Sequence, residues 1–228
     1  MKNAKAGSIS RALISVSDKS GLAELGIALN SFGIDILSTG GSAAVLREAG
    51  IPVKEVSDHT GSPEIMGGRV KTLHPTIHAG ILARRQNSSD MEQMIARNLD
   101  PIDLVIVNLY PFEQTRSAGS DYDTCIENID IGGPAMIRAG AKNHRSVTVI
   151  VEPEDYSILI KELAENDGRT SHRFREQMAA KAFRRTAAYD AAIGSWFAEV
   201  QEQSFPERII LAGKLENQLR YGENPHQS

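Results

Sequence analysis

The 228-residue chain contains a single cysteine, and aromatic residues make up only 5% of it. One cysteine excludes an internal disulfide and favours a reducing compartment, and we expect Cys125 to be a buried apolar residue. No apolar run approaches the roughly 20 residues that a bilayer-spanning helix needs, and the N-terminus has no apolar signal-peptide core. These absences favour a cytoplasmic protein without membrane association.

A strong charge of either sign is also missing. The formal net charge is −4 and no block of like charges forms a tail, so composition gives no support for nucleic-acid binding. Among the histidines, only His74 and His78 have a spacing that suits two ligands on one helix face, and no acidic or cysteine partner accompanies them. We expect no metal site, whereas a local pair of cations can still hold a small anion.

What is present is an alternation of short apolar runs with helical patterns, and 41% apolar residues suffice for one sizeable core. The expected strands are 12–16, 34–37, 53–56, 104–107 and 147–151. The expected helices are 22–29, 43–49, 123–128, 132–142, 153–165 and 171–200. Strands and helices that alternate in this way predict an α/β domain with a parallel sheet and right-handed crossovers.

The pattern over 171–200 has an apolar face along its whole length, and Ser171 is placed to cap it. Such a face can cover the sheet or pack against a second subunit, and we favour core packing. From Ser204 onward the periodicity is lost. We therefore assign residues 1–203 to one domain and residues 204–228 to a following linker.

Residues 67–75 hold the densest group of chemically active side chains. Behind a flexible glycine pair, Arg69 can bind a carboxylate or phosphate in two-point fashion, Lys71 adds a point charge and Thr72 adds a hydroxyl. We expect His74-Pro75 to end any regular element. The alternative is an ordinary solvated loop, and the pattern itself indicates a site for a small anion.

Polar and glycine-rich segments follow the expected strands. In parallel sheets ligands gather beyond the carboxyl ends of the strands, where these segments lie. Residues 38–41 follow the second strand, and residues 130–133 lead into a helix whose first N–H groups can hold an anion or a developing oxyanion. Several loops are thus expected to meet at one edge of the sheet.

Six motifs, in this order, closely resemble the IMP cyclohydrolase domain of bifunctional purine biosynthesis proteins, and the resemblance covers residues 10–200. The motifs are Ser15-Val16-Ser17-Asp18-Lys19, Ser38-Thr39-Gly40-Gly41, Gly68-Arg69-Val70-Lys71-Thr72-Leu73-His74-Pro75, Asn108-Leu109-Tyr110-Pro111-Phe112, Asp130-Ile131-Gly132-Gly133 and Lys142-Asn143-His144. Ser20 and Ser42 stand where the family often has threonine, and the hydroxyl is kept.

Residues 219–227 resemble the opening of the second domain of those proteins, which transfers a formyl group from 10-formyltetrahydrofolate to AICAR. The resemblance implies that residues 204–228 join a linker to the start of that domain, and that the chain is a fragment of a longer protein. Arg220 and Tyr221 would then touch the substrate of the second site. We expect no formyltransferase activity from these 228 residues.

The resemblance implies a methylglyoxal-synthase-like, three-layer α/β fold with a central, mainly parallel sheet, working as a homodimer. It also implies a reaction, the closure of 5-formamidoimidazole-4-carboxamide ribonucleotide to inosine monophosphate (IMP) with loss of water. Neither metal nor organic cofactor is expected for this step, and 10-formyltetrahydrofolate would be a co-substrate of the second domain alone.

The family motifs also imply roles for individual residues. Those expected to bind the phosphate are Ser15, Ser17, Lys19, Ser38, Thr39, Gly40 and Gly41. Arg69 and Thr72 are expected to line the nucleotide pocket, and N–H groups of the segment Ile131-Gly132-Gly133 to stabilise the formyl oxygen. The expected catalytic residues are Lys71, Tyr110, Asp130 and Lys142. Lys71 would donate toward the formyl oxygen while the other three form a proton relay, in which base and acid are not assigned.

Each catalytic candidate also has an ordinary structural explanation. Tyr110 can anchor the turn at Pro111, Asp130 can cap a helix, and Lys142 can satisfy carbonyl groups at a helix end. Two other functions compete with the cyclohydrolase. One is methylglyoxal synthase, whose expected acidic groups are not in place, and the other is a nucleotide-sensing module like the regulatory domain of carbamoyl-phosphate synthetase.

Overall fold

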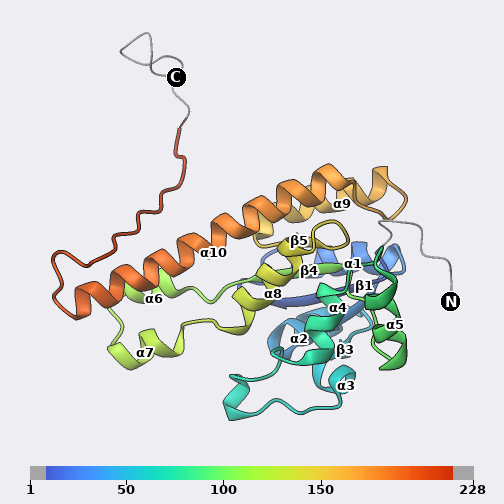
Figure 1. Cartoon of the computed structure of the whole chain (residues 1–228), viewed down its shortest axis with the longest axis horizontal. Coiled ribbons are helices and arrows are strands. Elements are labelled where there is room, and N and C mark those ends of the chain that lie inside the picture. Colours follow the sequence, from blue (N-terminus) through green and yellow to red (C-terminus); the bar gives the residue numbers. More distant parts are fainter. Residues whose placement is uncertain (1–8, 218–228) are drawn as a thin grey trace, which may run out of the picture.

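The computed structural model describes residues 9–217, which build a five-stranded sheet with helices on both faces (Figure 1). The strand order is β3-β2-β1-β4-β5, and every neighbouring pair is parallel. The strands are β1 (Arg11–Val16), β2 (Asp35–Ser38), β3 (Lys54–Glu55), β4 (Leu104–Asn108) and β5 (Thr148–Ile150). The predicted α/β class with a central parallel sheet is confirmed.

The helices that cover the sheet form two layers, each with its own cluster of buried residues (Figure 1). One layer contains α1 (Leu22–Ser31), α2 (Gly40–Glu48) and α9 (Tyr156–Glu165). The other contains α4 (Pro75–Leu82), α8 (Gly132–Lys142) and α10 (His172–Val200). The shorter elements are α3 (Val56–Thr60), α5 (Ser88–Ala96), α6 (Phe112–Ser117), α7 (Tyr122–Glu127), η1 (Met66–Gly68) and η2 (Pro153–Asp155).

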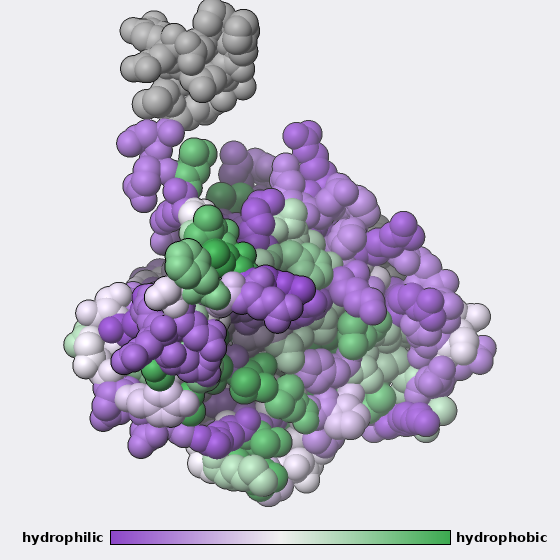
Figure 2. All heavy atoms as spheres, turned by 60° about the vertical axis from the view of Figure 1, so that its left-hand side comes forward, coloured by the Kyte–Doolittle hydropathy of each residue, from purple (hydrophilic) through white to green (hydrophobic). Residues whose placement is uncertain are grey.

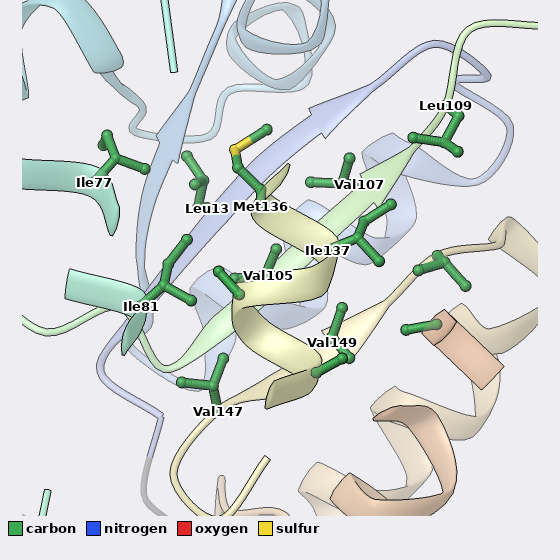
Figure 3. Packing of buried hydrophobic residues seen from close by; sticks show 14 of the residues in the cluster. Leu13, Ile77, Ile81, Val105, Val107, Leu109, Met136, Ile137, Val147 and Val149 are labelled. Carbon is green, nitrogen blue, oxygen red and sulfur yellow. The ribbon is translucent and has the colours of Figure 1, made fainter. Parts of the chain in front are cut away.

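Alternating side chains of the central strands supply both layers of the core. In β1, Leu13 belongs to the cluster beneath α8 whereas Ile14 belongs to the cluster beneath α1. Figure 3 shows Met136 and Ile137 of α8 packed over the strands, in the cluster that contains Leu13. Complete burial of such a side chain contributes roughly 1.5–3 kcal/mol, so the sheet is fixed from both faces.

The long helix α10 is part of this core. The side chain of Ser171 accepts the N–H of Phe174, as a capping residue should. Ala182, Tyr189 and Trp196 are buried in the cluster that also contains α8. The preference for core packing is confirmed, and Cys125 is also buried as predicted, with 1% of its surface exposed.

The expected strand at 53–56 is one residue too long at each end. Only Lys54 and Glu55 pair with β2, and Val56 begins α3 instead. Val56 is buried in the core as the first residue of that helix, so its apolar side chain reflects burial and not strand pairing. A short apolar segment at a sheet edge does not distinguish the two structures.

The expectation that His74-Pro75 ends a regular element is also wrong, because Pro75 begins α4. Proline fits the first helical turn, where its missing N–H has no partner to lose. His74 caps the same end, since its Nδ1 accepts the N–H of Thr76 at 3.2 Å. Helix α5 was not predicted either, because Met94 is its one buried residue and gives too weak a periodic signal.

Residues 201–217 follow α10 without a helix or strand, and Arg220 and Tyr221 lie outside the described residues. In the part of the chain from 9 to 217, no helix has the length and apolar character needed to cross a bilayer. The same residues contain no group of three or more His, Cys, Asp or Glu side chains arranged to hold a metal ion.

Two glycine-to-alanine changes test the packing of α4 against the chain before β4. A Cβ at Gly80 would lie 2.8 Å from the carbonyl oxygen of Asp100, which is backbone and cannot move away cheaply. We expect Gly80→Ala to lower the free energy of unfolding by about 1–3 kcal/mol. Gly194 in α10 has nothing within 4 Å of such a Cβ. Gly194→Ala should raise the same quantity by about 0.5–1 kcal/mol. Urea unfolding measures the free energy of unfolding of both variants. A change of the same sign in the two variants would contradict this account.

Candidate active site

A cleft of about 640 Å³ opens at the carboxyl ends of β1, β2 and β4. In the sheet, β1 lies between β2 and β4, so the chain connections from β1 and β4 run to opposite sides. Ligands of parallel α/β sheets bind at such a switch point, beyond the carboxyl ends of the strands. Thirteen predicted site residues line the cleft: Ser15, Ser17, Lys19, Thr39, Gly41, Arg69, Lys71, Thr72, Tyr110, Asp130, Ile131, Gly132 and Gly133. Loops far apart in sequence are thus brought together.

Three predicted site residues lie elsewhere. Ser38 is fully buried, and its hydroxyl donates to the carbonyl of Ile14 at 2.8 Å, which ties β2 to β1. Gly40 lines a neighbouring recess of about 340 Å³. Lys142 is exposed at the last position of α8, whose first residue lines the cleft. A helix rises about 1.5 Å per residue, so the length of α8 separates Lys142 from that end.

One wall of the cleft presents hydroxyl groups, a lysine and a helix N-terminus. Ser15 Oγ lies 3.2 Å from Thr39 Oγ1, across the ends of two strands. The side chain of Lys19 runs over Gly41, where an added Cβ would lie 3.2 Å from its Cε. The side chain of Thr39 makes no capping hydrogen bond to α2, so the first N–H groups of this helix have no side-chain cap from Thr39. Together they form a cradle with partial and full positive charge, which suits a phosphate.

Two residues that were not predicted as site residues hold this wall in shape. Asn108, at the end of β4, accepts the N–H groups of Ser17 (2.6 Å) and Asp18 (2.9 Å) through Oδ1 and donates to the carbonyl of Asp18 (2.8 Å). The hydroxyl of Ser42 accepts the N–H of Val16 and donates to its carbonyl, each at 3.0 Å. Their positions after a strand and at a helix start were visible in the sequence, but their partners were not.

A second wall of the cleft carries Asp130 with Lys71 and Tyr110. Burial raises the pKa of Asp130, while hydrogen bonds from the backbone of Gly133 and Tyr110 and the charge of Lys71 act in the other direction. Its Oδ1 accepts the N–H of Gly133 at 2.8 Å. Asp130 therefore does bond to the first turn of α8, and the same carboxylate lines the cleft beside a lysine.

At this wall, Gly132 and Gly133 lie directly against the side chains of Thr72 and Asp130. A Cβ at Gly132 would lie 2.7 Å from Thr72 Oγ1, and a Cβ at Gly133 would lie 2.5 Å from Asp130 Oδ2. No side chain fits at either position. Glycine is needed here because the segments bearing Thr72 and Asp130 come into direct contact with the start of α8.

At the mouth of the cleft, the guanidinium of Arg69 pairs with the carboxylate of Glu127. The two side chains are 64% and 58% exposed, so the pair adds little to stability and an incoming anion can replace Glu127. Gly67 and Gly68 precede Arg69 with φ of 65° and 88°. Both angles lie in the left-handed region that favours glycine, which explains why two glycines stand at these positions.

Exposed apolar residues stand near this mouth. Met66 is 71% exposed and Ile131 is 63% exposed. Figure 2, which turns the α7 side of the molecule forward, shows apolar patches interspersed with hydrophilic residues on this face. The surface around the cleft is therefore mixed and not uniformly charged.

Comparison with known proteins shows similarity to two protein families and to several curated relatives. Residues 21–135 match the MGS-like domain, and residues 140–228 match the AICARFT/IMPCHase bienzyme family. The bifunctional purine biosynthesis protein PurH of Rhizobium meliloti (strain 1021) is 56% identical over 96% of this chain, and that of Dinoroseobacter shibae is 57% identical over 95%. The chain spans about 40% of the length of these relatives. The crystal structure of ForH superposes with a TM-score of 0.72 at 37% identity, over 83% of this chain and all of that one.

The raised pKa of Asp130 predicts how its replacement changes stability. Because the folded protein holds this carboxyl above its ordinary pKa, ionisation costs stability at neutral pH, and the cost disappears as the pH falls through that pKa toward the unfolded value. Asp130→Asn keeps an oxygen for Gly133 and removes the charge. We expect the variant to be more stable than the wild type at pH 7, with a gain that shrinks on acidification. Urea unfolding across a pH series would refute this if the gain stayed constant.

Proposed function

The chain belongs to the MGS-like domain family and is similar to bifunctional purine biosynthesis proteins, and from that premise we propose that it is an IMP cyclohydrolase. It would close 5-formamidoimidazole-4-carboxamide ribonucleotide to IMP with loss of water. One observation carries the proposal: Lys19 with several hydroxyl groups, and Asp130 with Lys71 and Tyr110, line a single cleft. A ribonucleotide has its phosphate and its reacting base at opposite ends, and the cleft offers a partner for each.

In this proposal, the phosphate lies against the loop after β1 and the first turn of α2. Lys19 supplies charge, while Ser15, Ser17 and Thr39 offer hydroxyl groups. Asn108 fixes the loop beforehand, so binding the phosphate does not have to order it. Arg69 would leave Glu127 to contact the nucleotide, and Thr72 would line the base side of the pocket.

Ring closure requires a weakly nucleophilic carboxamide nitrogen to add to the formyl carbon. Lys71 would donate toward the formyl oxygen as charge builds there, and N–H groups of the segment Ile131-Gly132-Gly133 would add to this stabilisation. One preorganised donor of this kind is typically worth about 3 kcal/mol. Asp130 and Tyr110 would accept the proton that the nitrogen loses and return one to the hydroxyl that leaves as water. Lys142 has no part in this proposal, because it does not line the cleft.

Wider properties remain proposals that rest on the relatives. For the longer protein we propose a second activity, formyl transfer from 10-formyltetrahydrofolate to AICAR, with a cytoplasmic location. We propose that the cyclohydrolase itself uses no metal and no organic cofactor, and that the protein is a homodimer. The exposed apolar residues Met66 and Ile131 support an interface near the cleft. Light scattering that gives the mass of one chain at micromolar concentration would contradict the dimer.

Loss of turnover in Lys71→Ala is the sharpest test of the proposed chemistry. We expect wild-type protein to form IMP from the formamido substrate without added metal or folate, and the variant to lose at least about 100-fold in kcat, because the donor to the formyl oxygen is gone. Ultraviolet absorbance follows the product. Lys161→Ala is the matched control, since that lysine is exposed on α9 and pairs only loosely with Glu165 at 3.8 Å.

Two results would contradict the assignment. Near-wild-type turnover in Lys71→Ala would exclude Lys71 as a catalytic residue. Tight nucleotide binding by the wild type without any product would instead favour a nucleotide-sensing module.

Affinity for IMP tests the phosphate cradle separately. Lys19→Ala removes the full positive charge beside the first turn of α2, and we expect IMP to bind about tenfold more weakly, with an effect that shrinks at high salt. Calorimetry at two ionic strengths measures both quantities. A variant that binds IMP as tightly as the wild type would remove Lys19 from the site.

A further inference from the structure

Tyr189 lies in α10 and reaches the segment that carries Asp130. Its side chain is fully buried and does not line the cleft. The hydroxyl accepts the N–H of Asp130 at 2.9 Å and donates to the carbonyl of Asn128 at 3.0 Å. Burial raises the pKa of Tyr189 to about 12, so the hydroxyl keeps its proton at neutral pH and can serve both partners.

The segment that Tyr189 holds has no regular structure of its own. Residues 128–131 connect the end of α7 to the start of α8. Within this connection, Asp130 is held at two points: Tyr189 holds its backbone, and the N–H of Gly133 holds its carboxylate. The direction of the carboxylate in the cleft therefore depends on the backbone that Tyr189 fixes.

The ring of Tyr189 is itself fixed by its surroundings. Phe112 packs edge-on against it, with ring centroids 6.3 Å apart. The guanidinium of Arg185 lies 5.6 Å from the ring centroid and pairs with Glu113 at 3.0 Å. These contacts involve the ring and not the hydroxyl, so phenylalanine at this position would keep them.

We propose that Tyr189 is a positioning residue, which orients the carboxylate of Asp130 beside Lys71 by bonding both sides of the Asn128–Asp130 backbone. This rests on the proposed cyclohydrolase function. Without the hydroxyl, the half-buried N–H of Asp130 and carbonyl of Asn128 lose their partner, and the connection between α7 and α8 moves to find others. A displacement of about 1 Å in a catalytic group can cost a hundredfold in rate.

Tyr189→Phe tests the proposal because it removes the hydroxyl alone. We expect kcat to fall by about tenfold or more while KM for the nucleotide stays near the wild-type value, because the phosphate cradle lies on the other wall. Thr148→Val is the matched control. It removes a buried hydroxyl bond (2.8 Å to Thr170) at the start of β5, away from the carboxyl edge, and should lower the melting temperature without changing kcat.

Amide hydrogen exchange measured by NMR, without substrate, separates this inference from the function on which it rests. In Tyr189→Phe the amides of Asp130 and Gly133 should exchange faster, while amides of β1 keep their wild-type rates. Unchanged exchange at both amides would overturn the proposal even if the wild type proved inactive. Unchanged kcat in an active enzyme, or a kcat loss shared by Thr148→Val, would also overturn it. A wild-type protein that forms no IMP, with faster exchange at both amides in Tyr189→Phe, would count against the cyclohydrolase function and not against the positioning contact.

Discussion

The parallel pairing of β1 with β4 is the constraint on which the cleft depends. It places Asn108 directly beside Val16, so the side chain at the end of one strand bonds the loop that leaves the other. Since β2 pairs on the other side of β1, the start of α2 meets the same loop. A phosphate cradle follows from this register without any long-range charge, in a protein whose net charge is −4. Local geometry, and not overall electrostatics, is therefore the basis of the phosphate binding that we propose.

The second wall shows a different physical compromise. Asp130 is buried enough for its pKa to rise, which costs stability, yet it remains beside Lys71 and the N–H groups of α8. Sites of this kind are common where a carboxylate must exchange protons, because burial brings its pKa nearer to the working pH. The hydrophobic core offsets this cost in stability. The long helix α10 contributes to that core, and its Tyr189 bonds the segment that bears Asp130. Stability and the proposed chemistry thus share one helix.

Much of this arrangement could be predicted from the sequence, and particular residues show where prediction stopped. The apolar run that forms β1 and the cap at Ser171 are local signals, and both were predicted correctly. The contacts of Asn108 and Tyr189 join residues 91 and 59 positions apart, so no local pattern reveals them. Lys142 illustrates the same limit. The end of α8 was placed correctly, but which residues of this helix line the cleft depends on how it packs. Pro75 was misread because proline ends one helix as readily as it begins another.

A crystal structure of this chain with IMP bound tests the central claim most directly, because it locates both ends of the nucleotide at once. We expect the phosphate within hydrogen-bond distance of Lys19 Nζ and of the N–H groups that begin α2, with the base between Tyr110 and Asp130. A nucleotide whose phosphate lies instead beside Arg69, or which occupies the recess lined by Glu55 and Ser62, would contradict the account.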